Sequence, residues 1–321
     1  MSRLNKRLLF LAVIIGLISW VVIGCTSRSK KEGIIAEVNG EVITQEEFDK
    51  DFELAKKMRQ MRYGKEILSQ EVGENKTYED VLKEDLLGTL ILDKVINEEL
   101  EKNNIQVTDE EVEGALKNHY ITEFGGEEQF RRFLEDNEIS EEAIMRDVKR
   151  VLTFEKHKEF FFNEVELEEE EIKNYFNENK DSFVKFRISH ILVKTEEEGN
   201  RILEKLKNGE DFHTLVIMES VDSESAIQGG DLGYFTKDTI LKAYEPLGEA
   251  ASNLEIGEIS ELIKTELGYH IILLEDRIDS YEDLKEEVVE ELKNKKHNEK
   301  ILDLKGKADI KIYMDKSAKK E

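Results

Sequence analysis

The sequence predicts an α+β fold, with a mostly helical region followed by a smaller domain that contains strands. Residues 44–179 place their apolar side chains at helical spacing and contain no proline. Residues 186–193 and 268–274 are short runs rich in Ile, Leu and Val, which is typical of strands. Between them, GGDLG at residues 229–233 has three glycines in five positions, and this predicts a shaped loop.

Length and charge limit the classes of function. The chain has 321 residues, enough for about two domains of ordinary size. It carries 47 basic and 73 acidic side chains and a formal net charge of −26. A nucleic-acid partner needs a basic surface, so we expect none. Attachment to an anionic membrane by charge alone is excluded for the same reason.

The N-terminus has the plan of a secretory signal peptide. Arg3, Lys6 and Arg7 precede an apolar run at residues 8–23, and the run ends in VIGC at residues 22–25, which resembles a bacterial lipobox. This predicts a signal peptide at residues 1–24, then a lipid-bearing Cys25 and a flexible tether at 25–33. The alternative is an uncleaved membrane anchor with a stray thiol. Both place the bulk of the chain outside the cytoplasmic membrane, and a single cysteine permits no intramolecular disulfide.

The helical region begins with a short strand at residues 34–39 that ends in the turn signal Asn39-Gly40. Thr44 opens a capping box for a helix to about residue 62, and residues 64–76 resemble a loop. A helix over residues 78–103 carries a broad apolar face, which predicts packing on more than one side.

Four more helices are predicted before the strands, at residues 109–120, 127–137, about 140–162 and 168–179. After the strand-bearing domain, a charged helix runs from residue 281 to about 305 and ends near Gly306. Residues 309–313 alternate like an edge strand, and residues 316–321 form a polar tail.

If the two apolar runs are strands, alternation points His190 and His270 the same way as bulky apolar neighbours. Either histidine alone would be better explained as a satisfied core imidazole than as a site residue. A zinc site is disfavoured because neither histidine has a close second ligand in sequence, so we expect no metal and no cofactor.

The strand-bearing segment resembles the parvulin-type peptidyl-prolyl isomerases. Five elements occur in the family's order: SHILV at 189–193, KNGEDF at 207–212, GGDLG at 229–233, GEIS at 257–260 and TELGYHII at 265–272. The resemblance implies a small antiparallel sheet covered by helices over residues 183–277. It also implies cis/trans isomerisation of X-Pro bonds without a cofactor.

The same resemblance implies the site residues. His190 and His270 match the family's hydrogen-bonded histidine pair, and Asp222 matches the polar residue beside the substrate carbonyl. The substrate-binding residues are expected to be apolar or aromatic: Leu232, Ile240, Tyr244, Leu247 and Leu267. The family's pocket Phe falls on Tyr244 when counted forward from GGDLG. It falls on Leu247 when counted back from Ala250-Ala251, so a small insertion is expected here.

The helical region is similar to the N-terminal chaperone part of the PrsA and SurA foldases. The matching stretches are VNGEVIT at residues 38–44 and IQVTDEEV at 105–112. The resemblance implies that the isomerase domain is an insertion. The chaperone lobe would then comprise residues 34–182, completed by a helix and strand at 278–315.

Together these features predict an exported, lipid-anchored foldase that acts on unfolded or newly secreted chains containing X-Pro bonds. The first alternative is a non-catalytic holdase that uses the parvulin fold only to bind peptide. The second is an envelope scaffold protein. The sequence leaves the clients, the residue preferred before proline, and the choice between monomer and homodimer open.

Overall fold

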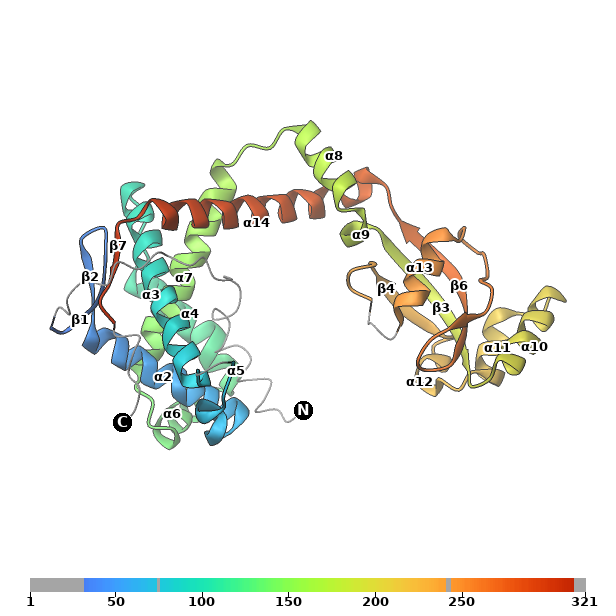
Figure 1. The fold of residues 1–321 in the computed structure, drawn as a ribbon, viewed down its shortest axis with the longest axis horizontal. Helices are drawn as coiled ribbons and strands as arrows, with labels where there is room; N and C mark the ends of the chain where they lie inside the picture. The colour runs from blue at the N-terminus through green and yellow to red at the C-terminus, as the bar shows by residue number, and fades with distance from the viewer. Residues whose placement is uncertain (1–31, 74–75, 241–243, 315–321) are drawn as a thin grey trace. The chain divides into compact units, whose positions relative to one another are not determined.

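The computed structural model describes residues 32–73, 76–240 and 244–314. The predicted signal peptide, Cys25 and the polar tail lie outside these residues. Within the described ranges, no helix has both the length and the apolar character needed to span a bilayer. The α+β class is confirmed: long helices accompany two small antiparallel sheets (Figure 1).

The chain divides into two compact units. The first comprises the described residues up to Val165 and from Lys296 onward, and the second is Glu166–Lys295. The sequence analysis placed the corresponding boundaries at residues 182/183 and 277/278. The second unit therefore includes two short helices that were assigned to the helical region, α8 (Glu169–Glu178) and α9 (Lys180–Phe183).

The first unit contains a three-stranded sheet in the order β2-β1-β7. Its strands are β1 (Ile34–Val38), β2 (Glu41–Thr44) and β7 (Ile310–Ile312). Asn39 and Gly40, with φ of 50° and 93°, form the turn of the β1–β2 hairpin. The C-terminal segment is an edge strand, as its alternation predicted. The sequence analysis missed β2.

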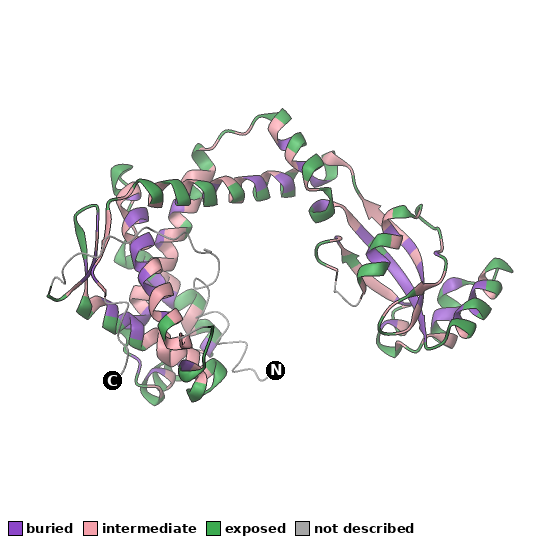
Figure 2. Ribbon diagram, in the orientation of Figure 1, coloured by how far each residue is buried: buried purple, intermediate pink, exposed green. Residues whose placement is uncertain are grey.

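Helices account for the rest of the first unit. They are α2 (Gln45–Tyr63), η1 (Lys65–Ser69), α3 (Tyr78–Lys102), α4 (Asp109–Ala115), η2 (Leu116–Ile121), α5 (Thr122–Phe124), α6 (Glu127–Asp136) and α7 (Glu141–Glu164). Thr44 and Thr108 cap α2 and α4 as predicted. The helix expected to reach residue 120 is α-helical only to Ala115 and continues as the π-helix η2. The apolar face of α3 is buried along its length (Figure 2).

Two buried polar clusters lie in the first unit. Asp51 of α2, only 5% exposed, accepts hydrogen bonds from Arg146 (3.0 Å) and Arg150 (2.5 Å) of α7. The second cluster, here called the helical histidine pair, is His157 of α7 and His297, whose Nδ1 and Nε2 atoms lie 2.9 Å apart. Both imidazoles are buried, so neither meets bulk water.

The second unit is built on a four-stranded antiparallel sheet in the order β4-β3-β6-β5. The strands are β3 (Lys185–Val193), β4 (Asp231–Phe235), β5 (Ile263–Lys264) and β6 (Tyr269–Ile278). Helices α10 (Glu196–Lys207) and α11 (Phe212–Glu219) pack on the sheet face that carries Ile191 and Ile271. Helix α13 (Glu245–Asn253) packs on the other face, against Ile188 and Ile272.

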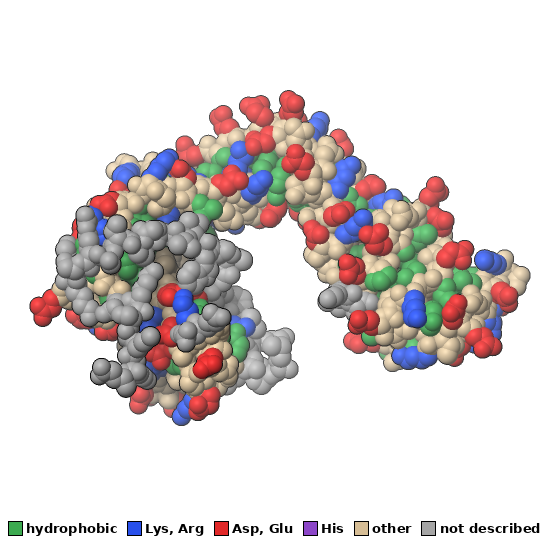
Figure 3. All heavy atoms as spheres, in the orientation of Figure 1, with side chains coloured by type: hydrophobic (Ala, Val, Ile, Leu, Met, Phe, Trp, Pro, Cys, Tyr) green, Lys and Arg blue, Asp and Glu red, His purple; other side chains and the backbone are tan. Residues whose placement is uncertain are grey.

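Helix α14 (Tyr281–Lys307) begins in the second unit, where its apolar side chains pack against α8 and α9. This packing accounts for the shifted domain boundary, because the first turns of α14 share a core with the helices before β3. The helix ends at Lys307, which confirms the predicted end near Gly306. Acidic side chains are spread over the surface in view (Figure 3), in agreement with the net charge.

Candidate active site

The two histidines of the parvulin-like segment meet on one face of the sheet. His190 lies in β3 opposite Ile272, and His270 lies in β6 opposite Leu192, so antiparallel pairing turns both imidazoles to the same side. Their Nδ1 atoms are 3.2 Å apart and both side chains are 0% exposed. We call His190 and His270 the site histidine pair.

Asp222 approaches the pair from a loop. It is the N-cap of α12 (Ser223–Ala226), and its side chain accepts from the backbone N–H groups of Glu224 and Ser225. Its Oδ2 lies 2.8 Å from His190 Nε2 and 2.8 Å from Ser225 Oγ. The local capping interaction therefore fixes the carboxylate against the imidazole.

Two hydroxyl groups complete the network, and the sequence analysis gave neither a role. Ser225 Oγ lies 3.0 Å from His190 Nε2, and Thr265 Oγ1 lies 2.9 Å from His270 Nε2. Asp222 followed by a short helix is an N-cap signal, but that signal gives no role to the Ser225 hydroxyl. Thr265 lay within a quoted motif, but its contact depends on the turn before β6.

One set of tautomers satisfies every contact in this network. The Thr265 hydroxyl donates to His270 Nε2, and His270 Nδ1–H donates to His190 Nδ1. His190 Nε2–H then donates to Asp222 Oδ2. The result is a chain of hydrogen bonds through two neutral imidazoles that ends on a carboxylate.

The electrostatics agree with this assignment. Burial lowers the pKa of His190, although Asp222 opposes the shift. Burial and the neighbouring His190 lower the pKa of His270 to about 4. Burial raises the pKa of Asp222, but hydrogen bonds from Ser225 and His190 lower it by more. At neutral pH both imidazoles are therefore uncharged and Asp222 is ionised.

An apolar and aromatic cluster adjoins the imidazoles. The ring of Tyr244 packs edge-on against both, with centroids 6.1 Å from His190 and 5.8 Å from His270. Leu232, Ile240 and Leu247 belong to the same cluster. Phe235 also belongs to it and was not singled out from the sequence.

The structure separates the residues between which the sequence could not choose. Leu247 is 0% exposed and packs in the core under α13, whereas Tyr244 is partly exposed and faces the imidazoles. Leu267 is 40% exposed and lies outside this cluster, in the turn before β6. The roles of these residues in substrate binding remain predictions.

The glycine-rich loop packs against the backbone of His190. Gly230 has φ of +84°, and its carbonyl oxygen accepts a 2.8 Å hydrogen bond from the N–H of His190. A Cβ at this position would lie 2.5 Å from the carbonyl oxygen of His190. Only glycine lets the loop approach the strand so closely.

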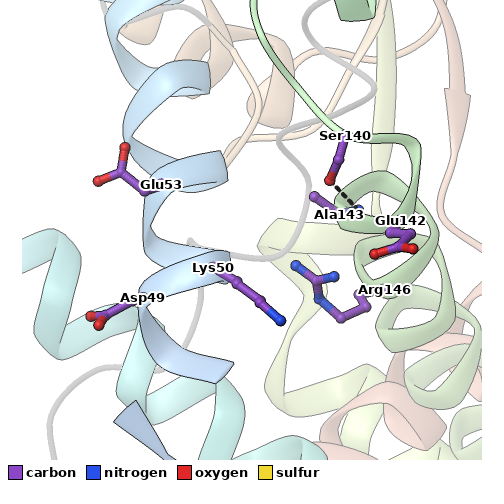
Figure 4. A pocket seen from close by; sticks show the side chains of 7 residues that line it. All are labelled: Asp49, Lys50, Glu53, Ser140, Glu142, Ala143 and Arg146. Atoms are coloured by element: carbon purple, nitrogen blue, oxygen red, sulfur yellow. Dashed lines mark hydrogen bonds between the residues drawn. The ribbon is translucent and has the colours of Figure 1, made fainter. Parts of the chain in front are cut away.

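The first unit contains a separate cavity of about 370 Å³ between α2 and α7 (Figure 4). Charged side chains line most of it, including Lys50 and Arg146. Ser140 Oγ at its edge accepts from the N–H of Ala143 and caps α7, and Arg146 bonds Asp51. Within the described part of the chain, no group of three or more His, Cys, Asp or Glu side chains is arranged to hold a metal ion.

Comparisons with known proteins agree with both units. Residues 1–158 match the family described as the SurA-like N-terminal domain, and residues 190–276 match the PPIC-type peptidyl-prolyl isomerase domain. The Foldase protein PrsA of Caldanaerobacter subterraneus is 34% identical over 300 residues, which cover 92% of this chain and 91% of that protein. The Foldase protein PrsA of Halalkalibacterium halodurans is 32% identical, covering 97% and 86%.

A solved structure of peptidylprolyl isomerase PrsA from Bacillus cereus is 28% identical, covers 88% of this chain and 94% of its own, and has a TM-score of 0.40. The NmPin parvulin of Nitrosopumilus maritimus is 50% identical over 28% of this chain, with a TM-score of 0.25. The sequence matches extend over nearly the whole length of this chain and of its relatives. The chain therefore belongs to the PrsA foldase family and carries a parvulin-type peptidyl-prolyl cis-trans isomerase domain.

Proposed function

We propose that His190, Asp222 and His270 form the centre at which this foldase isomerises X-Pro bonds of unfolded client chains. The main support is the hydrogen-bonded network, in which three separate segments bring together a neutral imidazole pair and one carboxylate. The network lies beside an apolar cluster. Peptide isomerisation requires no covalent step, so this set of groups needs no cofactor.

The geometry suggests how the barrier falls. The peptide C–N bond resists rotation by about 18–20 kcal/mol because resonance gives it double-bond character. Resonance also places partial negative charge on the carbonyl oxygen. An ionised Asp222 near that oxygen disfavours the planar amide relative to the twisted one. Tyr244, Leu232 and Ile240 would hold the proline ring while the preceding carbonyl turns.

The site histidine pair would position Asp222 and exclude water. His190 fixes Asp222 through a 2.8 Å hydrogen bond, and His270 fixes the tautomer of His190. Because both imidazoles are neutral and buried, they add no charge that would cancel that of the carboxylate.

We also propose that the chain is exported and anchored by lipid on Cys25. The support is the sequence alone: the basic start, the apolar run and the placement of the single cysteine. Labelled palmitate should be incorporated into the wild-type chain in bacterial cells and not into Cys25→Ser. Equal labelling of both chains would refute the proposal.

The alternative is a holdase that binds peptide without isomerising it, and Tyr244 and Ile240 at the insertion are the residues that favour it. Refolding of a client whose slow phase is prolyl isomerisation separates the two functions. The proposal predicts that the wild-type chain accelerates this phase and that Asp222→Ala does not, while both suppress aggregation. Equal suppression with no acceleration by either chain would establish the holdase.

A further inference from the structure

His213 in α11 joins that helix to the glycine-rich loop, and the sequence analysis gave it no role. Its Nδ1 atom lies 3.0 Å from the carbonyl oxygen of Gly229. Because a carbonyl oxygen can only accept, the Nδ1–H of His213 is the donor. A Cβ added at Gly229 would lie 3.3 Å from that nitrogen, so the imidazole packs directly on the loop.

The other imidazole nitrogen of His213 faces a carboxylate. Its Nε2 atom lies 3.5 Å from Oε1 of Glu275, and this oxygen is buried without a hydrogen-bond partner among the described residues. Glu275 is the extra residue of a β-bulge in β6, opposite the step from Arg187 to Ile188 in β3. A buried acceptor without a donor costs free energy, so a proton on His213 Nε2 would satisfy it.

Only the protonated imidazole satisfies both contacts. A neutral His213 that donates from Nδ1 to Gly229 presents the lone pair of Nε2 to the Glu275 carboxylate, and these repel each other. The opposite tautomer donates to Glu275 but presents a lone pair to the Gly229 carbonyl. The imidazolium donates from both nitrogens at once, and its charge pairs with the carboxylate.

The charged groups around His213 are mostly acidic. Glu275 faces it from β6, and the charges of Asp231 in β4 and Asp211 at the N-cap of α11 also act on it. The guanidinium of Arg187 in β3 bonds Asp231 at 2.6 Å, so its positive charge is already balanced. An imidazolium here therefore meets three carboxylates and one engaged cation. The His213 side chain is 47% exposed, so it exchanges protons with the solvent.

The loop connects His213 to the site histidine pair. Gly230, the residue after Gly229, accepts a 2.8 Å hydrogen bond from the N–H of His190 through its carbonyl oxygen. Two residues further on, Leu232 belongs to the apolar cluster beside the imidazoles. A loop that is fixed at Gly229 therefore holds both the backbone of His190 and one wall of the proposed proline pocket.

Helix α11 connects His213 to the carboxylate of the site. The helix ends at Glu219, and the N–H of Val221 then donates to the carbonyl of Leu192 in β3 at 2.8 Å. Asp222 is the next residue. His213 therefore bonds the loop at one end of α11, and Asp222 follows the other end.

We propose that His213 is a positioning residue for the isomerisation, and that it acts as an imidazolium that binds the glycine-rich loop and Glu275 together. This inference rests on the proposed catalytic function of His190, Asp222 and His270. Histidine side chains change charge between about pH 5 and 8. The contribution of His213 to kcat/KM is therefore largest in mild acid and declines as the pH rises and the imidazolium loses its proton.

The experiment compares kcat/KM of the full chain and its variants on one Leu-Pro tetrapeptide at about pH 5.5 and about pH 8.5. His213→Ala should lose about fivefold at the acid pH and at most about twofold at the alkaline pH, because only the imidazolium makes both contacts. In a Glu275→Gln background the loss should be the same at both. His213→Gln keeps a donor for Gly229 but no charge, so its rate relative to His213→Ala should not change with pH. Glu169→Gln is the matched control, because it removes a carboxylate from an exposed pair with Lys285 in the same unit.

The outcomes distinguish the two proposals. A pH-dependent loss in His213→Ala that Glu275→Gln abolishes and Glu169→Gln leaves unchanged supports the inference. An equal loss at both pH values, or no loss at either, overturns the inference and leaves the catalytic function standing. If His213→Ala does not fold, the ratio of wild type to His213→Gln decides, and a ratio that stays constant with pH overturns the inference. Absence of isomerisation by the wild type at both pH values overturns the catalytic function and the inference with it.

Discussion

Replacing Gly230 by alanine tests whether close packing of the glycine-rich loop against β3, the strand that carries His190, stabilises the second unit. The new Cβ would lie 2.5 Å from the carbonyl oxygen of His190, on a residue with φ of +84°. The left-handed backbone alone costs about 1–2 kcal/mol for a residue with a side chain. Moving the loop away also weakens the bond between the His190 N–H and the Gly230 carbonyl, which adds about 1 kcal/mol. We expect the second unit to lose about 2–3 kcal/mol of stability.

Two other glycines provide controls. Gly233 has φ of +73°, and a Cβ added there would meet nothing within 4 Å, so Gly233→Ala should show the backbone cost alone. Gly88 lies within α3 with open space around it, so Gly88→Ala should stabilise the first unit by about 0.5–1 kcal/mol. Urea-dependent hydrogen exchange of β3 and β6 reports the second unit separately. Equal losses for Gly230→Ala and Gly233→Ala would refute the close-contact argument.

Three further predictions concern charge. In each buried histidine pair one imidazole has a pKa of about 4 in the folded chain, below the ordinary 6.5. As the pH falls below 6.5 the unfolded chain therefore takes up protons before the folded chain does, and the folded state loses stability. The urea midpoint should be highest above pH 6.5 and fall toward pH 4, and a constant midpoint would contradict this. Arg150→Met removes one of the two guanidinium groups that bond buried Asp51, while Arg146 remains, and should cost about 1.5–3 kcal/mol in urea unfolding, against less than about 1 kcal/mol for the exposed Arg132→Ala; similar losses would refute the difference. Ser225→Ala removes a hydrogen bond that lowers the pKa of Asp222, so the acidic limb of the kcat/KM profile should move to higher pH, and an unmoved limb would count against an ionised Asp222.

Local signals in the sequence were enough to predict most elements of the fold. Thr44 and Thr108 cap helices because each hydroxyl accepts a hydrogen bond from the backbone N–H three residues later. This relation depends only on neighbours in sequence. The boundary of the second unit could not be predicted in this way. It depends on the first turns of α14 packing against α8 and α9, across about one hundred residues of chain.

In the candidate site, too, the sequence predicted some residues and missed others. Strand alternation placed His190 and His270 on one face, and the register of β3 with β6 confirms it. The resemblance indicated Asp222, which lies within hydrogen-bond distance of His190. Thr265 was missed because its contact with His270 arises from the turn before β6 and carries no periodic signal.

Counting along the chain could not decide whether Tyr244 or Leu247 stands where the family has its pocket Phe. Both are apolar or aromatic and lie three residues apart. The start of α13 at Glu245 decides their positions: Tyr244 stays outside the helix and faces the imidazoles, while Leu247 turns into the core. A side chain at a helix start can face either way, and packing alone determines which.

The most direct test of the central claim is protease-coupled isomerisation of a Leu-Pro tetrapeptide by the wild-type chain, Asp222→Asn and His190→Gln. His119→Ala is the control, because His119 is an exposed histidine of η2 in the first unit. We predict acceleration by the wild type and the control, and loss of at least about tenfold in kcat/KM for the two site variants. Full activity in a folded Asp222→Asn would contradict the assignment of the catalytic centre to this network.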